Sequence, residues 1–196
     1  MLNNLSEIKD VSWEEAFDNW KSREMNPICR DDWIEVATKI KGWPDWESWR
    51  TYSANQFDAK NRKWKKFLIN DPDTIIPNFQ VGPFSGWQKD LPKTNTYTFK
   101  ELIDLKPEYQ THSRILKILE NFPQPTEIIG AYIPEKNRIV CLEGSHRCAA
   151  IALAQHFNKN IIWTVKPAIV LTEFKQGEAE ILDSILKTGS SNPNAI

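Results

Sequence analysis

The sequence has little cysteine, almost no net charge and no long hydrophobic run. Its three cysteines show neither a disulfide framework nor the paired spacing of zinc ligands, so we expect reduced thiols. A formal net charge of −1 gives no overall field that would attract nucleic acid or an anionic membrane. No apolar run could span a bilayer, and the polar start of the chain lacks the regions of a signal peptide. These absences predict a cytoplasmic protein with no membrane partner.

A zinc site built from cysteine and histidine is not predicted. Cys141, His146 and Cys148 lie close together in the sequence, on either side of an expected turn. A structural zinc site needs a fourth ligand that converges with the other three. The sequence offers no such residue, so we assign no metal ligands.

Helical and strand patterns follow one another along 196 residues, which is enough chain for one compact unit. We predict an α+β fold in which a small mixed sheet with flanking helices occupies residues 63–187. A tryptophan-rich helical region, residues 1–62, precedes the sheet. Residues 188–196 are expected to form a disordered tail.

Three helices are expected in the tryptophan-rich region. Ser12 and Glu15 match a capping box, a second helix would begin near Asp31 or Asp32, and Asp45 would cap a third. Apolar residues recur at helical spacing in each helix and predict these buried stripes: Trp13, Ala16, Phe17 and Trp20; Trp33, Val36, Ala37 and Ile40; Trp46, Trp49, Ser53 and Phe57.

The concentration of tryptophan in this region has two interpretations. Seven of the nine tryptophans lie between Trp13 and Trp64, and such rings can stack on nucleic acid bases. Aromatic residues at helical spacing more often form a core, and acidic residues here balance basic ones. We therefore favour a packed core, with Arg50 and Lys60 facing solvent, and do not expect nucleic acid as the main partner.

The middle of the chain combines a basic cluster with a long irregular stretch. Residues 60–66 are mostly basic and would form either a solvated face or the border of a ligand site. Residues 70–96 contain several prolines and glycines, which predicts an irregular loop. Loops of this length are often functional, so Pro83–Trp87 could close over a ligand as a lid, or it could pack on the helices.

The remaining elements follow from capping and apolar patterns. Thr98 and Glu101 match a capping box for a helix that ends before Pro107. The other expected elements are helices at 111–121, 145–154 and 178–186 and strands at 127–133, 138–142, 161–166 and 168–172.

The five residues Glu143-Gly144-Ser145-His146-Arg147 join a predicted strand to a predicted helix. The first N–H groups of a helix have no internal partner and lie at the positive end of its dipole, so anions bind there. Ser145, His146 and Arg147 carry donors suited to phosphate oxygens, and Glu143 could take a proton or hold a metal ion. The alternative is an ordinary capped helix.

The segment Gly144–Ala150 resembles the signature of the ParB/sulfiredoxin superfamily, which has a strand, a glycine, a polar pair ending in Arg and then an alanine-rich helix. Related free-serine kinases also have an acidic residue before the glycine, as Glu143 is here. The resemblance implies a ParB/sulfiredoxin-like fold whose motif loop binds nucleotide phosphates. In sulfiredoxins the preceding helix also contributes, and the matching positions are Ser113 and Lys117, with Thr111 and Arg114 nearby.

The two best-known activities of that superfamily do not match this chain. Sulfiredoxins need a nucleophilic cysteine where this sequence has Ser145, and Cys148 is expected to be buried. ParB proteins carry a helix-turn-helix region after the motif domain, for which about forty residues leave too little room.

Two functions remain open at this stage. The first is a nucleotide-dependent phosphotransferase or phosphohydrolase that acts on a small molecule, with Glu143 and His146 in catalytic roles. Gly144, Ser145, His146, Arg147, Ser113 and Lys117 would bind the phosphates of a nucleoside di- or triphosphate, with Mg²⁺ as an expected companion. The second is a non-catalytic nucleotide sensor that contacts a protein or nucleic acid through its N-terminal helices. The base, the second substrate and the oligomeric state stay open.

Overall fold

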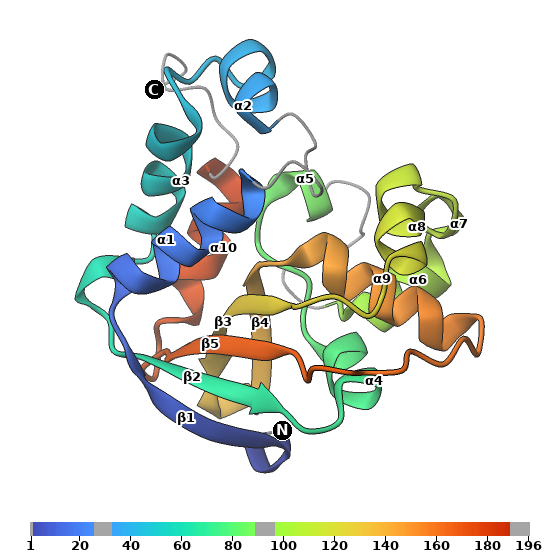
Figure 1. Ribbon diagram of the computed structural model, residues 1–196. Helices are drawn as coiled ribbons and strands as arrows, with labels where there is room; N and C mark the ends of the chain where they lie inside the picture. The colour runs from blue at the N-terminus through green and yellow to red at the C-terminus, as the bar shows by residue number, and fades with distance from the viewer. Residues whose placement is uncertain (1, 26–32, 89–96, 189–196) are drawn as a thin grey trace.

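The computed structural model describes residues 2–25, 33–88 and 97–188 (Figure 1). Its α+β fold, with a five-stranded mixed sheet in the order β1-β2-β5-β3-β4, confirms the predicted fold class. The strands are β1 (Leu5–Val11), β2 (Trp64–Ile69), β3 (Glu127–Ile133), β4 (Arg138–Glu143) and β5 (Ala168–Glu173). β3 and β5 are parallel, whereas the other neighbouring strands are antiparallel.

Helices lie on both faces of this sheet (Figure 1). The α-helices are α1 (Trp13–Glu24), α2 (Trp33–Glu35), α3 (Trp46–Asn55), α4 (Pro72–Ile75), α5 (Ser85–Gln88), α6 (Phe99–Leu105), α7 (Pro107–Gln110), α8 (Ser113–Glu120), α9 (Ser145–His156) and α10 (Ala179–Thr188). Short 3₁₀ turns are η1 (Leu2–Asn4), η3 (Ala59–Asn61), η4 (Ile76–Asn78) and η5 (Pro134–Lys136), and a π-helical turn, η2 (Val36–Ile40), continues α2.

The sheet separates two apolar clusters, because successive side chains of a strand point to opposite faces. Ile128 and Ile139 pack with α6, α8 and α9, whereas Ile129 and Val140 pack with the tryptophans of α1 and α3 and with α10. The second cluster combines buried residues of the predicted N-terminal region with buried residues of the predicted sheet region, whereas Leu2 and Leu5 pack against the first cluster from its edge.

The N-terminal third confirms two predicted helices and adds a strand that was not predicted. Ser12 and Asp45 cap α1 and α3 by accepting from the backbone N–H groups of Glu15 and Ser48. The strand β1 has no apolar face that could reveal it, because it is an exposed edge strand held by its pairing with β2. Ile40, predicted to face inward, is 72% exposed, since the π-helical turn η2 changes the helical spacing.

Two further predictions were wrong, and two others lie partly outside the described residues. The stretch after Asn70 is not wholly irregular, because Pro72 and Pro77 stand at the starts of α4 and η4, where the missing N–H costs nothing. Residues 161–166 are not a strand, since Trp163 Nε1 there donates to Asp73 Oδ1 at 2.9 Å and no ladder forms. The start of the helix predicted near residue 31 and the tail 189–196 fall outside the described ranges.

The elements around the motif were predicted well. The capping box of α6 is complete, with Thr98 and Glu101 bonding each other's backbone N–H groups. β3, β4 and α9 lie where the sequence places them.

A segment before α5 covers the outer edge of β4. Gln80 N donates to Ile139 O at 2.8 Å, and Cys141 N donates to Gln80 O at 3.0 Å. A Cβ atom on Gly82 would lie 2.3 Å from Cys141 O, so only glycine permits this close approach. The contact carries the chain along β4 toward α5 and the start of α9.

Candidate functional site

The site is built around the start of α9, directly after β4. Gly144 adopts a left-handed conformation, with φ 99° and ψ 13°, and turns the chain from strand into helix. No side chain caps this helix. Among the described residues, the backbone N–H groups of Ser145, His146 and Arg147 have no hydrogen-bond acceptor. These donors stand at the positive end of the helix dipole, the position at which the sequence predicts an anion.

Arg147 folds back over Gly144 onto Glu143. Its Nη2 atom lies 2.5 Å from Glu143 Oε1, and the side chains are only 16% and 9% exposed. A Cβ atom on Gly144 would come within 3.5 Å of Nη2 and 3.2 Å of Ile128 Cγ1. The glycine thus permits both the turn and the return of the arginine. Burial would lower the pKa of Arg147, but the charge of Glu143 raises it above its usual value.

The second oxygen of Glu143 meets an arginine from the N-terminal region. Arg23, at the end of α1, places Nη2 3.5 Å from Glu143 Oε2 and Nη1 2.7 Å from Glu127 Oε1. Lys66 Nζ lies 2.5 Å from the other oxygen of Glu127. Burial would raise the pKa of Glu127, but Lys66 and Arg23 lower it below its usual value. Charges of alternating sign therefore run from Lys66 to Arg147.

These pairings define the role of the predicted basic cluster. Lys66 connects to the motif through Glu127 and Arg23. Arg62 and Lys65 instead pair with Glu178 on the chain before α10 and with Glu7 on β1. Lys66 is therefore the residue of this cluster that borders the motif.

His146 is surrounded by aromatic rings from three other elements. Its ring centroid lies 4.8 Å from Trp87 of α5, 5.7 Å from His112 before α8 and 6.4 Å from Trp33 of α2. Tyr109 stacks between Trp87 and His112, at 5.7 and 6.4 Å. The lid segment predicted at Pro83–Trp87 thus does reach the motif, through Trp87.

Cationic groups also converge on His146. Burial lowers the pKa of His146 well below its usual value, and the nearby charges of Arg114, His112, Arg147 and Arg50 lower it further. The imidazole is therefore neutral at pH 7. In this state it does not carry the positive charge with which the sequence-based prediction has it offset the charge of a phosphate. A bound anion would favour its protonation.

Arg50 does not face solvent, contrary to the sequence-based expectation. Its guanidinium lies over the rings of Trp49 at 3.9 Å, Trp20 at 4.9 Å and Trp33 at 5.2 Å. Glu24 lies 3.2 Å from Arg50 Nη2. Helical periodicity could not predict the burial of Arg50, because its long side chain bends toward tryptophan rings that α1 and α2 contribute.

The two positions that the resemblance implies on the preceding helix lie on the exposed side of α8. Ser113 and Lys117 are exposed, and within the described ranges neither is bonded to the motif. Their neighbours His112 and Arg114 lie toward it instead: His112 faces His146, and Arg114 lies 4.1 Å above the Trp33 ring. The resemblance points to α8, and the residue before this helix, His112, does face the motif. Arg23 and His112 were missed, and no sequence signal connects Arg23 to the motif.

Two buried thiols lie beside the site. Cys141 Sγ lies 3.8 Å from Cys148 Sγ and 3.7 Å from Ser145 Oγ. Burial raises the pKa of the Cys148 thiol well above its usual value, so little thiolate forms. Cys148 is buried, as predicted, and cannot act as the missing nucleophile.

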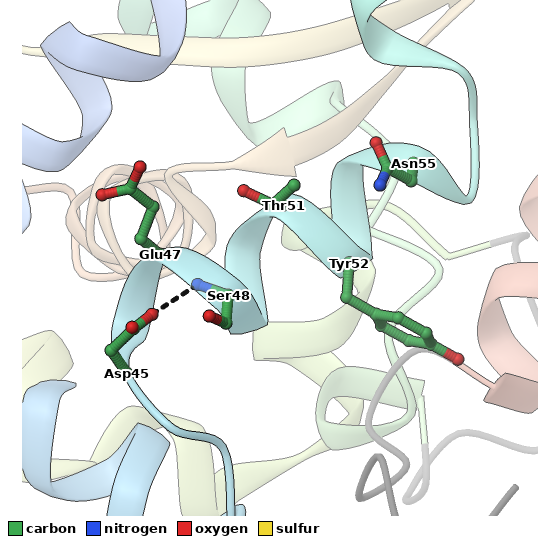
Figure 2. A pocket seen from close by; sticks show the side chains of 6 residues that line it. All are labelled: Asp45, Glu47, Ser48, Thr51, Tyr52 and Asn55. Atoms are coloured by element: carbon green, nitrogen blue, oxygen red, sulfur yellow. Dashed lines mark hydrogen bonds between the residues drawn. The ribbon is translucent and has the colours of Figure 1, made fainter.

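A surface hollow of about 470 Å³ lies elsewhere, along α3 (Figure 2). Figure 2 shows its lining residues arrayed along one helix and its cap: Asp45, Glu47, Ser48, Thr51, Tyr52 and Asn55. Asp45 already accepts from the N–H of Ser48, and Glu47 pairs with Lys21. Because its polar groups come from a single element and do not converge on one point, we place the functional site at the motif.

Comparison of the chain with protein-family models, with curated proteins and with solved structures finds no match. The ParB/sulfiredoxin resemblance therefore still rests on the motif. Within residues 2–25, 33–88 and 97–188, no group of three His, Cys, Asp or Glu side chains could hold a metal ion. In the same ranges, no helix is both long and apolar enough to cross a bilayer.

Proposed function

We propose that the protein binds a phosphorylated small molecule, of the nucleotide class that the ParB/sulfiredoxin resemblance implies, at the start of α9. The observation that carries this proposal is that the rings of Trp87 and His112 and the charges of Arg114 and Arg147 lie around His146, beside helix N–H groups that have no acceptor among the described residues. Arginine forks and helix N-termini both suit phosphate oxygens.

The aromatic rings support a ligand that is more than inorganic phosphate. Trp87 and Trp33 stand on different elements around His146, so the phosphate donors lie beside large planar surfaces. A base can stack on such surfaces with little dependence on its identity. A nucleoside di- or triphosphate would fit both features. Mg²⁺ would bind to the phosphate chain of the ligand rather than to Glu143, because both oxygens of Glu143 already contact arginines.

Phosphoryl transfer or hydrolysis is the catalytic form of this proposal. Glu143 would act as a base only after a ligand phosphate draws Arg147 away from it. We expect Glu143→Gln to abolish nucleotide turnover while nucleotide binding survives. Turnover by this variant at the wild-type rate would remove Glu143 from the chemistry.

The engagement of Glu143 by two arginines favours a second candidate function. A carboxylate held between Arg23 and Arg147 is suited to structure rather than to proton transfer. In this form the protein senses a nucleotide without consuming it, and the N-terminal helices contact a protein or nucleic acid partner. Incubation of the protein alone with nucleotide and Mg²⁺ distinguishes the two functions, since only the enzyme releases phosphate.

Calorimetric titration tests the binding site itself. We expect nucleoside mono-, di- and triphosphates to bind in the presence of magnesium, with Arg114→Met weakening the affinity by about tenfold. Lys117→Met, an exposed cation on the same helix, is the matched control and should leave the affinity within about twofold. If the affinity weakened in Lys117→Met but not in Arg114→Met, the ligand would contact Lys117, as the resemblance implies, and not Arg114. No heat with any phosphate compound would refute the proposed function.

A further inference from the structure

Arg23 joins the N-terminal region to the motif through two buried carboxylates. It comes from the last turn of α1, whereas Glu127 begins β3 and Glu143 ends β4. Because β3 and β4 are antiparallel, these two carboxylates lie on adjacent strands at the same end of the sheet. They are only 10% and 9% exposed, and Arg23 bridges them.

The guanidinium of Arg147 is only half used by Glu143. Its Nη2 atom contacts Glu143 Oε1, but its Nε atom is buried and has no acceptor among the described residues. Nε and Nη2 form one edge of the guanidinium, and a carboxylate normally takes both donors of such an edge. Glu143 does not do so here, because its Oε2 atom lies toward Arg23 instead.

We propose that Arg23 is a positioning residue for the anion site, which keeps Glu143 from closing a two-bonded fork with Arg147. Without Arg23, Glu143 Oε2 turns to Arg147 Nε. The closed fork neutralises Arg147 and fixes it on Glu143, so the site loses its strongest phosphate donor. The N-terminal region therefore sets the anion affinity of a motif that lies 120 residues further along the chain.

The effect on ligand affinity rests on the proposed function, but the fork itself can be measured without a ligand. In the wild-type protein the Arg147 Nε–H group, observed by NMR, should exchange rapidly for a buried group. In Arg23→Met its exchange should slow by about tenfold as the hydrogen bond forms. Glu143→Gln in the same background should restore fast exchange, because the amide cannot form a charged fork.

Two further variants separate positioning from folding. Arg23→Lys keeps the positive charge, but a lysine can contact only one of the two carboxylates. We expect that carboxylate to be Glu127, which lies closer to Arg23 than Glu143 does. Glu143 is then free to close the fork, so the exchange of Arg147 Nε–H should also slow in this variant. It serves where Arg23→Met fails to fold. Lys65→Met, which removes a neighbouring cation that pairs with Glu7 and not with Glu127, should leave the exchange unchanged.

Affinity for tripolyphosphate completes the test. We expect it to fall about tenfold in Arg23→Met and to recover in the double variant with Glu143→Gln. Exchange at the wild-type rate in both Arg23→Met and Arg23→Lys would overturn this inference. Slowed exchange in a protein that binds no phosphate compound would uphold the fork and refute the proposed function instead.

Discussion

At the scale of single residues, the motif combines a glycine with positive φ, a neutral imidazole and a paired arginine. The surrounding residues determine the role of each. Gly144 is needed for a backbone turn, His146 is neutral because of burial and nearby charge, and Arg147 is held by Glu143. Substitutions at these positions therefore separate backbone, charge and pairing effects.

Gly144→Ala should reduce both stability and anion binding. A side chain in the left-handed region costs about 1–2 kcal/mol, and the added Cβ would crowd Ile128 and Arg147. Gly177→Ala is the matched control, because Gly177 has φ 84° and no heavy atom within 4 Å of an added Cβ. Urea unfolding should show a loss in both variants, and phosphate titration should show a loss only in Gly144→Ala. Equal affinity in the two variants would contradict the role assigned to Gly144.

His146 should make stability fall at mildly acidic pH. Because the pKa of His146 is lowered in the folded state, the unfolded state binds more protons below the unfolded value of about 6.5. Its contribution to stability is thus complete above that pH and is lost as the pH falls, at up to about 1.4 kcal/mol per unit. Urea unfolding between pH 5 and 8 should show a shallower slope in His146→Gln. An unchanged slope would mean that His146 is not held neutral.

At the scale of elements, the site forms where helix starts and strand ends from separate parts of the chain meet. The start of α9, the residue before α8, the short helix α5 and the end of α1 surround the motif. α5 is the element that the lid hypothesis singled out, and Trp87 is its contact with His146.

Trp87 should distinguish nucleotides from simple polyphosphates. We expect Trp87→Leu to weaken nucleotide binding by about tenfold, since base stacking on an aromatic ring contributes about 1–3 kcal/mol. Tripolyphosphate binding should change little, because it uses the helix N–H groups and the arginines. Trp163→Leu is the control, as Trp163 packs on Phe122 and bonds Asp73. An equal loss for both ligands would show that Trp87 supports the fold rather than the base.

The sequence could predict the elements of the site but not their mutual placement. Local signals, such as the capping box at Thr98 and the glycine turn at Gly144, depend on neighbours within a few residues and were predicted correctly. The contact of Arg23 with Glu143 spans 120 residues and depends on how α1 packs, so no local pattern contains it. The contacts of His112 with His146 and of Arg114 with Trp33 depend on the rotation of α8, which the resemblance does not fix.

At the scale of the whole molecule, the predicted regions 1–62 and 63–187 share one sheet and one apolar cluster. β1 pairs with β2, and the tryptophans of α1 and α3 pack on the same face of the sheet as α10. Parts that share a sheet and an apolar core stabilise each other. The predicted regions are therefore expected to fold as one cooperative unit.

Equilibrium unfolding in urea tests this cooperativity. We expect a single transition, with the same midpoint by tryptophan fluorescence, which reports mainly the N-terminal cluster, and by far-ultraviolet circular dichroism. Two separated midpoints would instead establish residues 1–62 and 63–187 as independent domains.

The central claim is that the start of α9 binds the phosphate group of a small molecule. Titration of the full chain with tripolyphosphate, followed through its backbone amide NMR signals, tests this most directly. We predict saturable shifts that are largest at the N–H groups of Ser145, His146 and Arg147. Saturable shifts confined to the hollow along α3, or unmoved signals at these three residues, would contradict it.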